Sequence, residues 1–336
     1  MWRAAKKHSE SGRLEVRTYI IRRVLQMIPV FLGIIIILFF IVDAAPGDYV
    51  AGMINPKLSA EQQAALREKL DPDAPVIQKF WNWLTEVFQG NLGYSLSHQK
   101  PVTEVIGSLI GPTFQLSICA LIVAILVGVP CGIISATRQY SKLDTGLTIF
   151  SLVGISIPSF FFGLLLIKFL AVDLGWFPVF GLRDVTLMNA NFFVRFFDGV
   201  WHMILPVTVL GLSSAASFMR YTRSAMLEVI RQDYIRTARA KGLKERVVIY
   251  RHAFRNGMIP IITLIGFWIP SLFSGAIMTE SVFGLPGLGK VMVEAVAKRN
   301  EPLIIGICAL LAVLTLVAAL AADILYAVAD PRIRYD

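Results

Sequence analysis

Six long stretches without a charged side chain constrain the fold of this 336-residue chain more than any other feature. A helix rises about 1.5 Å per residue, so about 20 residues cross a hydrocarbon core about 30 Å thick. The second stretch is too long for one crossing, and we expect Gly111-Pro112 to divide it. The pattern therefore predicts an all-α membrane protein with six transmembrane helices. The stretches are Val24–Val42, Val105–Thr137, Thr145–Ile167, Gly199–Met219, Asn256–Thr279 and Pro302–Ala322.

The composition agrees with a surface that faces lipid. Only 16% of the residues are charged, 56% are hydrophobic and the mean hydropathy is +0.66, whereas soluble proteins carry roughly 25% charged residues. The net charge of +9 does not indicate nucleic acid, because the basic residues gather at the ends of apolar stretches and in one loop. We therefore expect membrane lipid as a partner and no nucleic acid.

Lysine and arginine also predict the orientation of the chain. Seven of them lie in the first 23 residues, and ten lie between Arg220 and Arg255 against three acids. Positively charged loops stay in the cytoplasm, so both termini and this loop are predicted to be cytoplasmic in a multi-pass protein of the cell (plasma or inner) membrane. The first apolar stretch is longer than the core of a signal peptide and is followed by Asp43, so we interpret it as a retained anchor.

The connection between the first two spans is predicted to be a small helical segment outside the cytoplasm. Ser59 and Gln62 have capping-box spacing at the start of one short helix. A second, amphipathic helix runs from Ile77 to Phe88, with Gly90 as its stop. Two interpretations stay open: a cap packed on the membrane surface, or a docking surface for an external protein. The predicted segments are a cytoplasmic tail (1–18), a first transmembrane helix (19–43), the extracytoplasmic helical segment (44–112), a main transmembrane domain (113–330) with a cytoplasmic loop at 226–256, and a cytoplasmic tail (331–336).

The sequence offers no candidate catalytic residue and no candidate metal site. Gly284–Lys290 matches the phosphate-binding pattern G-x-x-x-x-G-K, but Val291 stands where a serine or threonine must hold magnesium. We interpret this segment as a glycine-rich turn. The four histidines have no metal-ligand spacing, and the three cysteines lie in apolar stretches as small hydrophobic residues. No carboxylate lies near the middle of a predicted span, which argues against transport coupled to an ion gradient.

The predicted fifth span carries small and polar residues on one face. Such residues allow close packing against another helix, or they line a weakly polar translocation path, and both interpretations stay open. The residues on this face are Ser271, Ser274, Gly275 and Met278.

The segment Asp233–Asn256 in the basic loop has the pattern of two short helices that meet at a glycine. Asp233 is expected to cap the first helix, and Tyr234, Ile235 and Ala238 form an apolar face. Gly242 is its stop, and a second helix begins at Lys244 and leads back to the membrane. A rigid knob with a small apolar face and a basic rim suits a cleft on another protein. A solvated basic loop that only satisfies topology is the alternative.

This loop resembles that of the integral-membrane permease subunits of dipeptide/oligopeptide ABC importers. The similarity covers roughly residues 17 to 334, and several motifs occur in the same order as in that family. One departure is that Arg236, Thr237 and Ala238 occupy the places of the Glu-Ala-Ala of importers in general. The matching segments are Asp233–Leu243, Arg251–Asn256, Pro46–Asp48, Gly90–Ser95, His202–Pro206, Thr279-Glu280, Pro286–Gly289 and Asp330–Arg334.

The resemblance implies a type I ABC importer permease fold and a non-catalytic subunit that forms half of a translocation path for di- and oligopeptides. It implies three kinds of partner: a second homologous permease in a heterodimer, two cytoplasmic ATPase subunits and an extracytoplasmic substrate-binding protein. ATP and magnesium bind to the ATPases, and no cofactor binds to this chain. The coupling helix that docks the ATPase maps onto Asp233, Tyr234, Ile235, Arg236, Thr237, Ala238, Lys241 and Gly242.

Two alternatives to peptide import remain at this point. The same machine serves oligosaccharides or chelated nickel in related systems, and the permease sequence does not separate these cargoes. A receptor or an ion-coupled carrier without an ATPase is the other alternative, against which the absence of carboxylates within the predicted spans argues.

Overall fold

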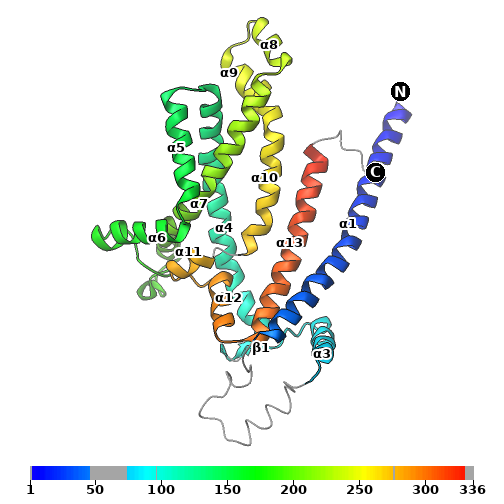
Figure 1. The fold of residues 1–336 in the computed structure, drawn as a ribbon, viewed down its shortest axis with the longest axis vertical. Coiled ribbons are helices and arrows are strands. Elements are labelled where there is room, and N and C mark those ends of the chain that lie inside the picture. Colours follow the sequence, from blue (N-terminus) through cyan, green and yellow to red (C-terminus); the bar gives the residue numbers. More distant parts are fainter. Residues whose placement is uncertain (1, 46–73, 96, 275–276, 330–336) are drawn as a thin grey trace, which may run out of the picture.

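The computed structural model describes residues 2–45, 74–95, 97–274 and 277–329. They form an elongated bundle of helices with one two-stranded antiparallel hairpin at one end (Figure 1). The long helices are α1 (Trp2–Ala44), α4 (Val102–Thr137), α5 (Lys142–Ser156), α7 (Phe192–Ile230), α10 (Phe254–Ser274) and α13 (Glu301–Ala329).

The two ends of the bundle differ in what they carry. At one end, called the α8 end, lie α8 (Asp233–Ala240), the start of α1 and the turn between α4 and α5 (Figure 1). The opposite end, called the α12 end, holds the shorter elements (Figure 1). These are α3 (Val76–Phe88), β1 (Tyr94–Ser95), β2 (Lys100–Pro101) and α12 (Leu288–Ala297).

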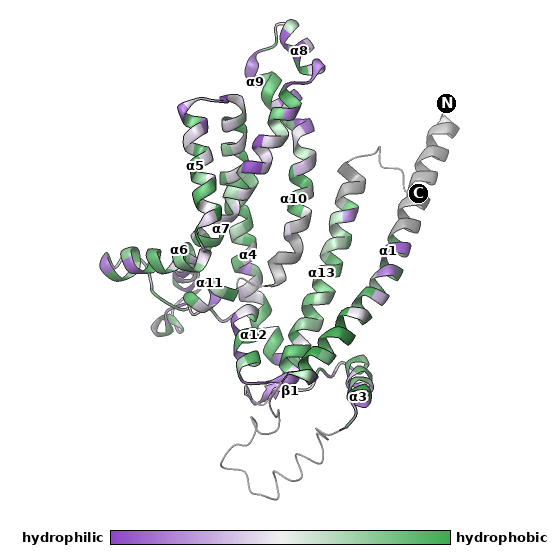
Figure 2. Cartoon of the chain, viewed as in Figure 1, coloured by the Kyte–Doolittle hydropathy of each residue, from purple (hydrophilic) through white to green (hydrophobic). Residues whose placement is uncertain are grey.

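The apolar stretches become long helices as predicted. Among the described residues, four helices are long and apolar enough to cross a membrane, and a bent pair of helices makes a fifth span if it is counted as one. Figure 2 shows apolar residues along the shafts of these helices, with hydrophilic residues gathered around α8 and at helix ends. The fifth predicted stretch falls on α10, which has 21 residues. The total of six spans stays a prediction.

The predicted division at Gly111-Pro112 is wrong, because α4 runs without a break from Val102 to Thr137. A proline inside a helix removes one hydrogen bond, which neighbouring contacts can offset. Here Ile106, Leu109 and Leu116 on both sides of the proline are buried in the core, so both halves are held in line. Helix α4 therefore begins at Val102, and the predicted end of the extracytoplasmic segment at residue 112 stays a prediction.

The third predicted span is also not one straight helix. The chain bends by 100° between α5 and the helices that follow, α6 (Ser159–Leu166) and the π-helix η2 (Ile167–Asp173). Ile157 has an extended backbone (ψ 123°) because the ring of Pro158 disfavours the helical conformation of the residue before it. Figure 1 shows the α6 arm projecting sideways from the bundle.

The amphipathic helix predicted from Ile77 to Phe88 is present as α3, Val76–Phe88. Gly90 follows it with a φ of +80°, a backbone conformation that glycine adopts without strain. The short helix predicted to start at Ser59 lies outside the described residues. Helix α1 extends back through the predicted N-terminal cytoplasmic tail to Trp2.

Helices α4 and α7 pack closely because glycines face their partner's backbone. A side chain at Gly128 or Gly132 of α4 would collide with α7, and one at Gly211 of α7 would collide with Val123 of α4. Small residues let two helix backbones approach, which stabilises pairs of helices inside membranes by van der Waals contact. Gly211, in the predicted fourth span, therefore serves the close packing of α7 against α4.

The glycine-rich segment Gly284–Lys290 encloses a carboxylate of the chain itself. Glu280, in α11 (Ile277–Val282), is only 1% exposed. Its Oε1 accepts a hydrogen bond from Thr113 Oγ1 (2.8 Å), and its Oε2 accepts one from the Lys290 amide (3.0 Å). Thr113 Oγ1 in turn accepts from the Leu288 amide (2.8 Å). The carboxylate thus satisfies the start of α12, where helix amides and the helix dipole favour negative charge.

This arrangement explains why the segment resembles a phosphate-binding loop. A Cβ at Gly287 would overlap the Glu280 carboxylate, so glycine is required where the chain passes closest to the anion. The prediction of a turn at this position is confirmed, whereas the burial of Glu280 was not predicted from the sequence.

Replacing Glu280 by alanine is expected to lower the free energy of unfolding by about 2 kcal/mol, because Thr113 and the Lys290 amide lose a buried acceptor. Thermal unfolding in detergent, followed with a dye that reacts with the three partly buried cysteines, measures the change. Glu104→Ala is the control, because Glu104 pairs with Lys100 on the surface and its loss costs under about 1 kcal/mol. Equal destabilisation of the two variants would contradict this account.

Candidate functional site

The helix predicted in the basic loop is present with the predicted bounds. Helix α8 runs from Asp233 to Ala240, and Gly242 follows it with a φ of +74°. The predicted cap is wrong by one position: Gln232 is the N-cap residue, and Asp233 lies in the first turn. A carboxylate there still favours the helix through the dipole, and it lies 3.5 Å from the Arg236 guanidinium, with both side chains exposed.

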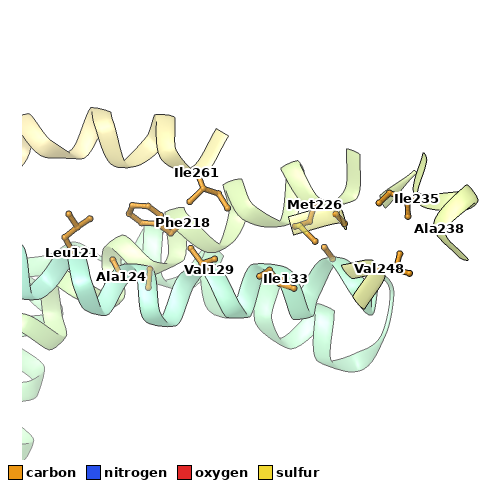
Figure 3. Packing of buried hydrophobic residues seen from close by; sticks show 13 residues of the cluster. Leu121, Ala124, Val129, Ile133, Phe218, Met226, Ile235, Ala238, Val248 and Ile261 are labelled. Atoms are coloured by element: carbon orange, nitrogen blue, oxygen red, sulfur yellow. The ribbon is translucent and has the colours of Figure 1, made fainter. Parts of the chain in front are cut away.

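The apolar face of α8 packs against its own chain. Ile235 is 0% exposed and Ala238 is 7% exposed. Figure 3 shows these side chains next to Met226, at the end of α7, and facing Val248 on the returning segment. Ile235 and Ala238 of the predicted apolar face are therefore not available to another protein, whereas Tyr234 of that face is exposed and docking stays a prediction. Burial of the first two side chains fixes α8 on the bundle.

The segment after α8 returns to the membrane through a π-helix. Lys244 precedes α9 (Glu245–Val247), which passes into η4 (Val248–Ala253) and then into α10. A π-helix, with hydrogen bonds from i to i+5, has more residues per turn than an α-helix and so brings residues five apart closer to the same side. Val248 and Ala253 are both fully buried in this way, beneath α8. The predicted second helix from Lys244 is confirmed.

Two polar contacts hold the turn at Gly242 in shape. Arg239 donates hydrogen bonds to Glu245 across the glycine, from Nη2 to Oε1 (2.7 Å) and from Nε to Oε2 (3.1 Å). These bonds hold the pKa of the Glu245 carboxyl below its ordinary value. Asn256 Nδ2 donates to the hydroxyl of Tyr234 (2.8 Å), which ties α8 to the start of α10. Sequence reasoning missed Arg239 and Glu245, whose only signal is opposite charge on either side of the glycine.

The outward face of α8 is polar, with one base and one acid. At 3.6 residues per turn, Asp233, Arg236, Thr237 and Ala240 lie opposite the buried pair, and all four are exposed. The side chains of Arg236 and Asp233 are 74% and 95% exposed. Six of the eight predicted docking residues are therefore accessible, while two face inward. The accessible six are Asp233, Tyr234, Arg236, Thr237, Lys241 and Gly242.

A partly buried ion pair holds α7, which leads into α8, against the turn between α4 and α5. Arg223 of α7 donates from Nε and Nη2 to the two carboxylate oxygens of Asp144, each at 2.9 Å. Asp144 also accepts from the Ser135 hydroxyl and the Tyr140 amide. Paired hydrogen bonds of this kind fix orientation as well as distance. The partners are 79 residues apart in the chain, so no local pattern could reveal them.

The predicted translocation-path residues are divided between two helices. Ser271 and Ser274 belong to α10, which ends at Ser274, and Met278 belongs to α11. The prediction of one helix face that runs through Met278 is therefore wrong. Met278 is exposed. Gly275 and the side chains of Ser271 and Ser274 lie outside the described residues. A path along this region stays a prediction.

Comparison with protein families decides the class of the chain. Residues 128–335 match the family described as "Binding-protein-dependent transport system inner membrane component", and residues 16–117 match the N-terminal segment of such components. This chain belongs to that family. It is a multi-pass membrane permease of the ABC importer class, a transport subunit and not an enzyme.

Relatives match this inner membrane component over nearly their whole lengths. The oligopeptide transport system permease protein AppB of Bacillus subtilis (strain 168) is 44% identical over 318 residues, which is 94% of this chain and 99% of AppB. The di/tripeptide transport system permease protein DppB of Pseudomonas aeruginosa is 37% identical, over 95% and 99% of the two chains. The dipeptide transport system permease protein DppB of Escherichia coli (strain K12) is 38% identical, over 94% and 98%.

A solved structure shares the fold of the permease. A chain of the MetNI methionine ABC transporter, in an inward-facing conformation, superposes with a TM-score of 0.51 at 17% identity. The match covers 68% of this chain and 97% of the MetNI chain. The predicted importer permease fold is thereby confirmed, with the number of helices left aside.

Replacing Ile235 by alanine is expected to loosen α8 from the bundle without unfolding the rest. Loss of a buried isoleucine side chain costs about 2 kcal/mol or more, which raises amide hydrogen exchange in α8 about 30-fold. Exchange measured by mass spectrometry on peptides that cover residues 233–243 checks this. Arg236→Ala, on the opposite face of the same helix, is expected to change exchange by less than about threefold. Similar rates in both variants would show that burial of Ile235 does not fix the helix.

Proposed function

We propose that this permease subunit carries peptides across the membrane as half of the translocation path of an ATP-driven importer. Three relatives named as di- or oligopeptide permeases support peptide as the cargo, at 37–44% identity over nearly complete chains. The other half of the path comes from a second homologous permease in a heterodimer. An extracytoplasmic binding protein delivers the peptide. ATP and magnesium bind to two cytoplasmic ATPases, with no cofactor on this chain.

The proposed orientation puts the α8 end in the cytoplasm, together with both termini. The support is the distribution of charge: hydrophilic residues gather around α8 (Figure 2), and ten lysines and arginines lie between Arg220 and Arg255. Basic loops are retained on the cytoplasmic side during insertion. The α12 end, with α3 and the β-hairpin, is then extracytoplasmic.

The observation that carries the proposed mechanism is that α8 has one buried face and one exposed polar face that presents Arg236. The exposed face, centred on Arg236 and Thr237, docks into a cleft on the ATPase, whose complementary charge orients it. The buried face, Ile235 and Ala238, contacts the end of α7 and the segment before α10. When the ATPases close, a displacement of α8 moves α7 and α10 as rigid units, because close-packed interiors transmit strain.

The ion pair between Asp144 and Arg223 extends this connection to the neighbouring spans. It joins α7 to the α4–α5 turn at the same end of the bundle. Movement of α7 is therefore passed to α4 and α5, and Gly128 and Gly132 keep α4 in contact with α7 further along.

Glu280, the buried acid at the α12 end, does not support transport coupled to an ion gradient. Both carboxylate oxygens of Glu280 accept hydrogen bonds from Thr113 and the Lys290 amide. A carboxylate enclosed by its own chain in this way serves to hold α12 in place.

Reversing the charge of Arg236 is expected to weaken ATPase docking. Arg236→Glu places an acid where the ATPase cleft meets a base, and the ATPases recovered with the permease should fall about tenfold, equivalent to 1.4 kcal/mol. Peptide uptake falls with it. Arg138→Glu makes the same charge change at an exposed position of the α4–α5 turn and is expected to leave recovery unchanged. Unchanged recovery with Arg236→Glu would refute docking through this face.

The cargo is tested separately by the binding protein that works with this permease. Mass spectrometry of the ligand that co-purifies with it is expected to find di- or oligopeptides. An oligosaccharide or a nickel chelate would overturn peptide import and leave the docking proposal intact.

A further inference from the structure

Helix α3 carries an apolar stripe that does not face the protein. Ile77, Trp81 and Phe88 have exposures of 64%, 57% and 83%. Their spacing of four and seven residues places all three on one side of a helix, within about 40° of each other. Exposed aromatic and aliphatic side chains in one line along a short helix indicate a surface that another apolar phase covers.

The stripe is separate from the face that anchors α3. Phe80 and Trp83 pack against Phe39 of α1, with ring centroids 5.6 Å and 6.0 Å apart, and Leu84 beside them is buried. The third side of the helix carries Gln78, Asn82 and Glu86, all exposed. The helix therefore has three sides: one packed on the bundle, one apolar and exposed, and one polar.

An ion pair fixes the depth of α3 relative to the first span. Lys79 Nζ lies 3.0 Å from Asp43 Oδ1, and Asp43 is the first charged residue after the apolar stretch Val24–Val42. The pair is thus located where the hydrocarbon core gives way to headgroups. A helix tied to this point lies at the boundary between the hydrocarbon core and the water, and not deep in either of them.

The apolar surface of α1 continues toward the stripe. The most apolar part of α1, within Ile20–Ala44, is only 11% buried inside the protein. Phe40 and Ile41, in the last turns before Asp43, are exposed large hydrophobic residues. In Figure 1, α3 lies against the end of α1 that carries these residues. The lipid that covers α1 therefore reaches the level of α3.

We propose that α3 lies in the membrane–water interface, with Ile77, Trp81 and Phe88 inserted among the lipid headgroups and the ends of the acyl chains. Gln78, Asn82 and Glu86 then face water. Tryptophan suits this position because its ring is apolar and its N–H is polar, and amphipathic helices bind interfaces through such a face. The proposal assigns the stripe to lipid and not to a delivering protein, and it depends on neither the cargo nor ATPase docking.

The test places a fluorescent label on the stripe and on the polar side of the same helix. Trp81→Cys and the adjacent Asn82→Cys are labelled with nitrobenzoxadiazole, in a chain whose three native cysteines are replaced by alanine. The full permease complex is reconstituted in phosphatidylcholine vesicles, with the binding protein absent. Two quenchers are compared: a lipid that carries a doxyl group near the headgroup, and aqueous cobalt.

At position 81 we expect the doxyl lipid to quench at least threefold more strongly than at position 82, and cobalt to show the opposite order. Equal access of cobalt to both positions would overturn the proposal, because the stripe would then face water. Protection of position 81 from both quenchers would also overturn it, since protein would then cover the stripe.

A second pair guards against a variant that misfolds. Phe88→Cys on the stripe and Glu86→Cys on the polar side repeat the comparison one to two turns further along α3. Each labelled protein is first checked for recovery of its ATPases and for thermal unfolding. Loss of lipid quenching at both stripe positions, in proteins that still transport, overturns the proposal and leaves the proposed function untouched.

Discussion

Burial of Ile235 and Ala238 is the contact on which the functional geometry of this permease depends. These two side chains meet Met226 from α7, and Val248 and Ala253 from the segment before α10, so three parts of the chain share one apolar cluster (Figure 3). The contact decides which face of α8 is left for a partner. Without it the loop would be a flexible basic connection, because eight helical residues alone are too few to form a stable helix in water.

Polar contacts at the two ends of the bundle complement this apolar cluster. At the α8 end, Arg223 and Asp144 join three helices through paired hydrogen bonds. At the α12 end, Glu280 satisfies the first amides of α12 and reaches Thr113 on α4. Buried charges destabilise a protein unless they are paired or hydrogen-bonded, so each cluster specifies one arrangement of the helices around it. Between the clusters, glycines keep α4 and α7 in contact.

Predictions from local patterns succeeded where the physical cause is local. The bounds of α8 and α3 follow from helical periodicity and from a glycine with positive φ just beyond the C-terminal end of each helix. Prolines were harder to interpret. Pro112 lies within the unbroken helix α4, whereas Pro158 marks a bend of 100°. The two differ in the packing around them, since buried residues on both sides of Pro112 hold the helix in line, and sequence alone does not contain that information.

The sequence by itself determined the membrane class, the order of the apolar stretches and the family. Hydrophobicity over about 20 residues and the motifs of the basic loop are local properties of the chain. Only the tertiary structure decided which face of α8 is free, because periodicity defines a face but not what covers it. Only the tertiary structure likewise showed the burial of Glu280, whose hydrogen-bond donors lie 167 and 10 residues away. The predicted docking helix therefore packs Ile235 and Ala238 against its own chain and leaves its polar face exposed.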